Sequence, residues 1–154
     1  MQHTLNIDLE TYSSEDIKSA GLYRYAQSPD FEILLFGFSF DNAPVQVIDL
    51  ACGEKVPDWV MGALYDPNVI KKAFNAAFEW YALSRWIWMQ TDRLFGVPFS
   101  DKHLLPISQW NDTMIQALYC GYPGSLDGAG SAIGLPTDKK RTIVTGKQIG
   151  RAHV

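Results

Sequence analysis

The sequence predicts an α/β domain built on a mixed five-stranded sheet with helices on its faces. Residues 4–10 alternate apolar and polar side chains, which is typical of a strand with one buried face. Further along, β-rich segments alternate with segments of helical pattern, as in sheets whose neighbouring strands run parallel. The chain has 154 residues, 47% hydrophobic and 13% aromatic, which is enough for one folded core.

The first half of the chain predicts a strand, a short helix and a hairpin. Residues 13–21 have a serine N-cap, acids in the first turn and Gly21 as the end of a short helix. Residues 30–40 and 45–50 are rich in β-branched, aromatic and aliphatic side chains, and the turn cluster 41–44 joins them as a hairpin.

The next segments predict a crossover unit. Residues 56–65 have an apolar face and a proline near their start, which indicates a helix, and 69–74 reads as a strand. Asn75 is the expected N-cap of a long helix over 76–94, which ends at Gly96. The crossover helix places the strand at 69–74 parallel to the first strand and beside it.

The rest of the described pattern completes the sheet. Residues 107–110 predict a last short strand, and 111–121 and 124–134 predict two helices. In sheets of this kind, functional residues gather at the ends of the central strands.

Charge and composition exclude several function classes. Residues 1–135 contain 16 acids and 8 Lys or Arg, a net charge of −8, which argues against a simple electrostatic grip on DNA phosphates. It leaves open a site whose positive charge comes from metal ions. No apolar run approaches the roughly 20 residues of a membrane helix. The absence of a secretory signal and the isolated Cys52 and Cys120 predict a cytoplasmic protein.

The strongest chemical signal is a pair of acids in the first strand. Asp8 and Glu10 lie on one face with Cα atoms about 6.6 Å apart, so both can reach one hard cation such as Mg²⁺ or Mn²⁺. A bare pair of this kind is more often an exposed polar strand face. Glu79 in a first helical turn is likewise favoured by the helix dipole alone. Their joint placement on adjacent strand ends favours a site.

Two short motifs resemble a known family. The stretch "NIDLETYS" followed by "NAAFEW" resembles the first and second motifs of the DEDD (DnaQ-like) 3′–5′ exonucleases, proofreading nucleases of the ribonuclease H-like fold. Asp8 and Glu10 match the first motif. Asn75, Phe78 and Glu79 match the second, with Glu in place of the usual Asp.

The likeness extends to the exonuclease domains of bacteriophage-type family A DNA polymerases. Stretches similar to "LYRYAQSPDFEILLFGFSFD", "PVQVIDL", "DPNVIKKAFNAAFE" and "ALYCGYPGSLDGAGSAIGL" follow one another there in this order. We therefore expect an exonuclease-like domain over 1–135 and a non-homologous tail over 136–154 that is disordered or artefactual. A bacterial or phage-infected cell is the expected location.

The resemblance implies two-metal hydrolysis of the 3′-terminal phosphodiester of single-stranded DNA. Asp8 would bridge two Mg²⁺ or Mn²⁺ ions, Glu10 would hold the ion on the nucleophile side, and Glu79 would support the second ion through water.

The implied partners are the 3′ end of single-stranded DNA and the polymerase domain of the same full-length chain, with no membrane partner. Backbone groups near Leu9 and Thr11, with the side chains of Asn75 and Phe78, would pack against the terminal nucleotide.

One departure from the family predicts impaired activity. The family's third motif places a Tyr or His a few residues before a fourth acid, and no acid after Glu79 has that spacing. Asp112, at an expected strand-to-helix junction, is not assigned as a ligand. Two alternatives stay open: a non-catalytic module of the same fold that binds nucleic acid or a partner, and a ribonuclease H-like nuclease that acts on RNA.

Overall fold

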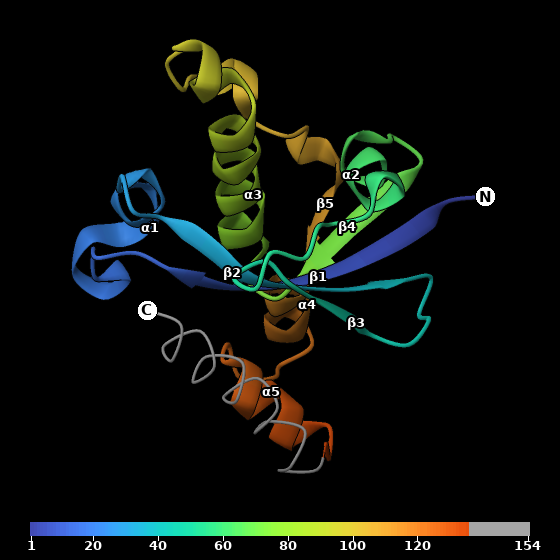
Figure 1. Ribbon diagram of the computed structural model, residues 1–154. Coiled ribbons are helices and arrows are strands. Elements are labelled where there is room, and N and C mark those ends of the chain that lie inside the picture. Colours follow the sequence, from blue (N-terminus) through green and yellow to red (C-terminus); the bar gives the residue numbers. More distant parts are fainter. Residues whose placement is uncertain (136–154) are drawn as a thin grey trace.

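A computed structural model describes residues 1–135 of the chain. Its helices and strands follow one another as shown in Figure 1. The elements are β1 (His3–Tyr12), α1 (Ile17–Gln27), β2 (Glu32–Phe40), β3 (Gln46–Asp49), α2 (Asp58–Tyr65), β4 (Val69–Ala73), α3 (Ala76–Gln90), β5 (Trp110–Asp112), α4 (Thr113–Tyr119) and α5 (Leu126–Ala132). None of the helices in this part of the chain has the length and apolarity needed to cross a bilayer. The tail predicted over 136–154 lies outside the described residues.

The sheet has five strands in the order β3-β2-β1-β4-β5. β2 pairs antiparallel with both β1 and β3, whereas β4 pairs parallel with β1 and β5 pairs parallel with β4. The predicted mixed five-stranded α/β sheet of the ribonuclease H-like class is therefore confirmed, as is the crossover through α2. β1 is central and has neighbours on both edges.

The alternation in β1 divides the two faces of the sheet. Leu5, Ile7 and Leu9 are almost fully buried, and they pack in one core with side chains from α2 and α3. Burial of each such side chain contributes about 1.5–3 kcal/mol. Asp8 lies on the opposite face and is exposed. The hydrophobic pattern alone thus fixes which way the acids of β1 point.

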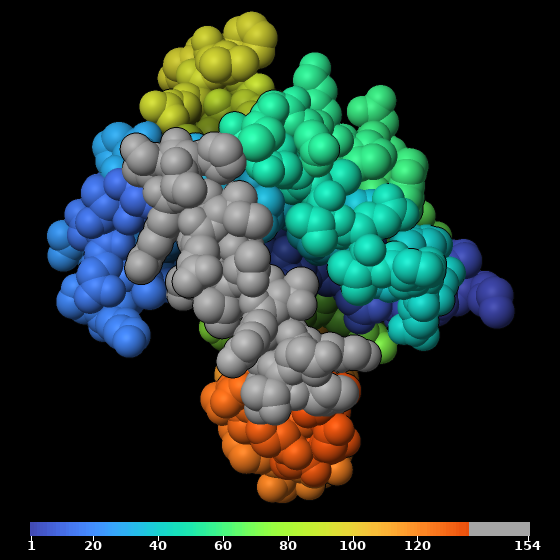
Figure 2. Space-filling view, turned by 60° about the horizontal axis from the view of Figure 1, so that its bottom comes forward, coloured from blue at the N-terminus to red at the C-terminus, as the bar shows by residue number. Residues whose placement is uncertain are grey.

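The two faces of the sheet are covered unequally. In Figure 1, α1, α2 and α3 lie on one side of the sheet, and α4 and α5 lie on the other. α4 buries none of its residues and α5 buries only Ala129 and Gly130. Figure 2 shows this helical pair, in orange, projecting from the body of the molecule. The face that carries Asp8 is thus the less covered one.

The helix predicted over 13–21 begins later than expected, and a second helical segment follows it. α1 begins after Asp16, whose side chain accepts a hydrogen bond from the Lys18 N–H, and it continues to Gln27. Gly21 has φ 80° and ψ 168°, which is not helical, so it ends the first helical segment as predicted, and a second segment follows up to Gln27. Glycine tolerates this conformation, and Tyr25 and Ala26 of the second segment are buried.

The predicted strand at 107–110 is displaced. Ile107–Gln109 forms a 3₁₀ turn, and β5 begins only at Trp110. The long helix α3 also ends at Gln90, and a separate 3₁₀ turn over Asp92–Phe95 follows before Gly96. Short strands have a weak local signal, because their pairing partner decides where they begin.

A buried lysine connects β4 to the segment before β5. Lys71 is completely buried, and its Nζ donates hydrogen bonds to the carbonyl oxygens of Asp66 and Val69 and to Oε1 of Gln109. Burial lowers the pKa of Lys71 to about 8, against the opposing effect of the Asp66 charge. The three acceptors satisfy all of the donors of the ammonium group.

We expect Lys71→Ala to lower the free energy of unfolding by about 2–5 kcal/mol, because it leaves a cavity and three buried or half-buried acceptors without their donor. Urea denaturation measures the change. Lys72→Ala, the neighbouring and partly exposed position, is the control and should cost less than about 0.5 kcal/mol. Equal losses in the two variants would contradict a special role for Lys71.

Candidate carboxylate site

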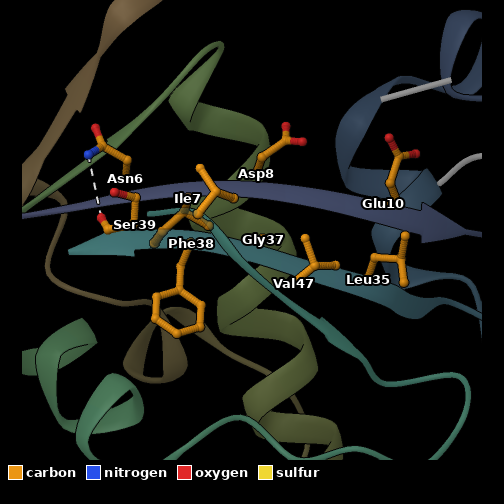
Figure 3. Close-up of a pocket in the computed structure, with 10 residues that line it drawn as sticks. Asn6, Ile7, Asp8, Glu10, Leu35, Gly37, Phe38, Ser39 and Val47 are labelled. Carbon is orange, nitrogen blue, oxygen red and sulfur yellow. Dashed lines mark hydrogen bonds between the residues drawn. The ribbon is translucent and has the colours of Figure 1, made fainter. Parts of the chain in front are cut away.

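The two acids of β1 face the same side of the sheet. Asp8 lies opposite Gly37 of β2, and Glu10 lies opposite Leu35. Figure 3 shows both carboxylates rising from one side of β1, the side on which Asn6 also stands. The pairing with β2 shifts register directly after Glu10, where the strand is irregular. The predicted placement of Asp8 and Glu10 on one face is therefore what the structure contains.

A hollow of about 250 Å³ lies beside Asp8 and Glu10. Leu35, Val45 and Val47 give it an apolar lining next to the two acids. Gly37 keeps it open, because it carries no side chain where a Cβ atom would lie 3.3 Å from the backbone oxygen of Asp8. Desolvation by the surrounding atoms raises the pKa of the Asp8 carboxyl, although the residue keeps exposed surface.

Glu79 reaches β1 from the first turn of α3. Its side chain is 5% exposed, and its carboxyl lies beside the backbone of Leu9, where the nearby N–H groups of Leu9 and of Glu79 itself act to lower its pKa. The edge of β1 is free at this point because its pairing with β4 ends at Asn6. The structure thus brings Glu79 to the strand segment between Asp8 and Glu10.

The surroundings of the Glu79 carboxyl disfavour its ionised form. Burial is the main reason that its pKa rises to about 8, and the charges of Asp8 and Asp112 raise it further. One carboxyl oxygen, Oε2, is buried and has no hydrogen-bond partner. At neutral pH the metal-free chain therefore holds Glu79 mainly in its neutral form.

Among residues 1–135, no group of three or more His, Cys, Asp or Glu side chains is arranged so that it could hold a metal ion as it stands. The chemistry of the donors still fits a hard cation. Asp8 and Glu79 are carboxyls whose ionised forms are disfavoured, and Oε2 of Glu79 is a buried acceptor without a donor. A divalent cation would relieve both conditions, with the carboxyls drawn together around it.

The four residues expected to contact nucleic acid are placed differently from one another. The Leu9 side chain is buried in the core, which leaves only its backbone for a ligand. The Thr11 hydroxyl hydrogen-bonds the Tyr25 hydroxyl at 2.9 Å, and the half-buried Phe78 ring lies 6.2 Å from the Tyr25 ring. Asn75 is exposed and adopts the left-handed conformation, with φ 69°. The Thr11 hydroxyl and the Phe78 ring therefore both lie next to Tyr25.

The sequence indicated the junction of Asp112 but not what its side chain does. Its carboxylate accepts hydrogen bonds from the backbone N–H groups of Asn75 and Ala76, at 3.0 and 3.1 Å. It also accepts the N–H of Met114 at 2.8 Å, as the N-cap of α4. The capping pattern before α4 was readable in the sequence, whereas the contact with α3 depends on the packing of β5 beside β4.

Comparison with known proteins gives one informative match. No protein-family model matches the sequence. Over 138 residues, 90% of its length, the chain is 42% identical to a DNA polymerase of Bacillus phage SP02. Those residues are 19% of that polymerase, so the chain spans about a fifth of the relative it matches. The chain is thus similar to one part of a phage DNA polymerase.

The raised pKa of Glu79 predicts a pH-dependent stability. Because the folded pKa of about 8 lies above the unfolded value of 4.5, the folded chain holds a proton that the unfolded chain releases between these pH values. The free energy of unfolding should therefore fall as pH rises from 4.5 towards 8, by up to about 1.4 kcal/mol per pH unit.

Urea denaturation at several pH values, without metal, measures this dependence. Glu79→Gln should largely remove it, because glutamine cannot ionise. Glu32→Gln, at an exposed position of β2, should leave it unchanged. A wild-type profile that rises through this window would show that Glu79 is not buried as a neutral acid.

Proposed function

We propose that the chain is a 3′–5′ exonuclease domain of a DNA polymerase, acting on the 3′ end of single-stranded DNA inside a phage-infected bacterial cell. The observation that carries the proposal is the contact of Glu79 with the backbone of Leu9, between Asp8 and Glu10. The acids of the two motifs lie about seventy residues apart in the sequence. This contact brings Glu79 of α3 next to the central strand of a ribonuclease H-like sheet, which carries Asp8 and Glu10. The similarity to a phage DNA polymerase supports it.

Asp8, Glu10 and Glu79 are the residues that would hold divalent metal ions. When bound, Mg²⁺ or Mn²⁺ would supply an activated water as nucleophile and stabilise the departing 3′ oxygen. Asp8 and Glu10 stand side by side on the open face of the sheet, where a phosphate can approach. Glu79 contributes a carboxyl that lies beside the Leu9 backbone and is shielded from water, so its charge acts strongly when it forms.

The terminal nucleotide would be held next to these acids. The partly exposed Phe78 ring is available for stacking, which tolerates any base, and Asn75 offers an exposed side-chain amide at the start of α3. The net charge of −8 over residues 1–135 makes binding dependent on the cations that the acids attract.

Activity of this chain should be slow. The three acids proposed here are one fewer than the four that the resemblance implies, and both oxygens of Asp112 are used by backbone N–H groups. A site with fewer carboxylates binds divalent metal more weakly, because each one contributes charge and a coordinating oxygen.

One observation favours a second candidate function. No metal-binding group of three acids is assembled in the described part of the chain. A non-catalytic module of the same fold, which binds nucleic acid or a protein partner, would need no such group.

A nuclease that acts on RNA is distinguished from the main proposal by comparing DNA and RNA oligonucleotides of the same sequence.

Metal titration separates the first two functions. If the acids bind Mn²⁺, the ion should stabilise the folded chain, by about 2.7 kcal/mol at a concentration one hundred times its dissociation constant. Thermal denaturation with increasing MnCl₂ measures this effect. Asp8→Ala should abolish most of the shift, and an unchanged melting temperature in wild type would favour the non-catalytic module.

Cleavage of a 5′-labelled single-stranded oligonucleotide tests the activity. We expect slow, Mn²⁺-dependent shortening from the 3′ end. Asp8→Ala should reduce it by about 100-fold, the order of loss for one preorganised charge-stabilising group. Asp58→Ala, an exposed acid of α2, should cleave like wild type. Shortening that survives Asp8→Ala would assign the activity to another source.

A further inference from the structure

Asp112 connects three elements through one carboxylate. The residue ends β5 and pairs with Ala73, the last residue of β4. Its Oδ1 accepts the N–H groups of Asn75 and Met114, and its Oδ2 accepts the N–H of Ala76. A weaker contact joins Oδ1 to the N–H of Ile115 at 3.4 Å. The starts of α3 and α4 are thus held by the same side chain.

α3 depends on this contact because it has no cap of its own. Asn75 occupies the N-cap position, but its left-handed backbone, φ 69° and ψ 56°, leaves its side chain without a capping hydrogen bond. The first N–H groups of a helix need acceptors from outside the helix. Asp112 supplies them from a neighbouring strand, and a carboxylate there also interacts favourably with the helix dipole.

The same contact leads directly to Glu79. Glu79 lies in the first turn of α3, only three residues after Ala76, and its buried carboxyl lies beside the backbone of Leu9. A helical turn is rigid, so a displacement of the α3 start moves Glu79 relative to β1. Asp112 is thus connected to β1 in three steps: its hydrogen bonds with two backbone N–H groups, the first turn of α3, and the Glu79 side chain.

We propose that Asp112 is a positioning residue for the carboxylate site: by holding the Asn75 and Ala76 N–H groups, it fixes the place of Glu79 against β1. It acts through Glu79 and contacts neither metal nor substrate. The inference rests on the proposed metal-dependent function, and it adds a residue that the motifs of the first strand and α3 do not contain. Residues that orient metal ligands typically influence metal affinity by about 10- to 100-fold.

The test compares three variants of the 154-residue chain. Asp112→Ala removes all acceptors, whereas Asp112→Asn keeps one acceptor oxygen and loses the charge. Asp16→Ala is the matched control, because Asp16 is also an aspartate N-cap, with its Oδ1 3.2 Å from the Lys18 N, but of α1. Two readouts are used: hydrogen exchange of the Leu9 amide in metal-free protein, by NMR, and Mn²⁺ affinity, by electron paramagnetic resonance. Urea denaturation confirms that each variant is folded.

We expect Asp112→Ala to increase exchange of the Leu9 amide on the order of tenfold, because the buried Glu79 carboxyl beside this amide shields it from water and moves with the start of α3. Mn²⁺ affinity should fall by about 10- to 100-fold. Asp112→Asn should restore part of both, and Asp16→Ala should change neither. A role limited to capping α4 would lower stability without changing the Leu9 amide.

The two possible failures are distinguishable. If Asp112→Ala leaves Leu9 exchange and Mn²⁺ affinity as in wild type, the positioning role is wrong while the proposed function stands. If wild type binds no Mn²⁺, the proposed function fails, and Leu9 exchange in the metal-free variants decides the positioning role alone. If Asp112→Ala does not fold, Asp112→Asn, the closest isostere, gives the same two readouts.

Discussion

The parallel pairing of β4 with β1 is the constraint on which the rest of the structure depends. It joins His3–Asn6 to Val69–Lys72 and stops there. Because it stops, α3 can begin beside the edge of β1 beyond Asn6, and the buried Glu79 carboxyl can lie next to the backbone of Leu9. A pairing longer by two residues would use that edge for the strand ladder, and no carboxyl could reach it.

Electrostatics turns this geometry into a site. Fully exposed to water, the carboxyls of Asp8, Glu10 and Glu79 would all ionise at neutral pH. Here burial raises the pKa of Glu79 to about 8 and also raises that of Asp8. Burying an acidic side chain costs free energy, and acids with strongly shifted pKa values cluster at functional sites. The burial and the nearby charges that keep Glu79 protonated also make the metal-free chain receptive to a divalent cation.

The carboxylate site also depends on residues that belong to no motif. Lys71 holds the turn before β5 through Gln109, and β5 brings Asp112 to the first N–H groups of α3. Gly37 keeps the face beside Asp8 free of a side chain. Each of these residues satisfies a local requirement of its own strand, and together they set where the acids stand.

The sequence alone determined the strand of Asp8 and Glu10, the face on which both lie, and the neighbours of that strand, which are the antiparallel hairpin and the parallel strand at 69–74. Alternation is a local signal, and the crossover rule fixes the direction of the connection. Tertiary structure decided the rest. A second helical segment follows the break at Gly21, and its residues Tyr25 and Ala26 are buried. The burial of Glu79 and the contact of Asp112 with α3 join residues more than thirty positions apart in each case, and only packing can create such contacts.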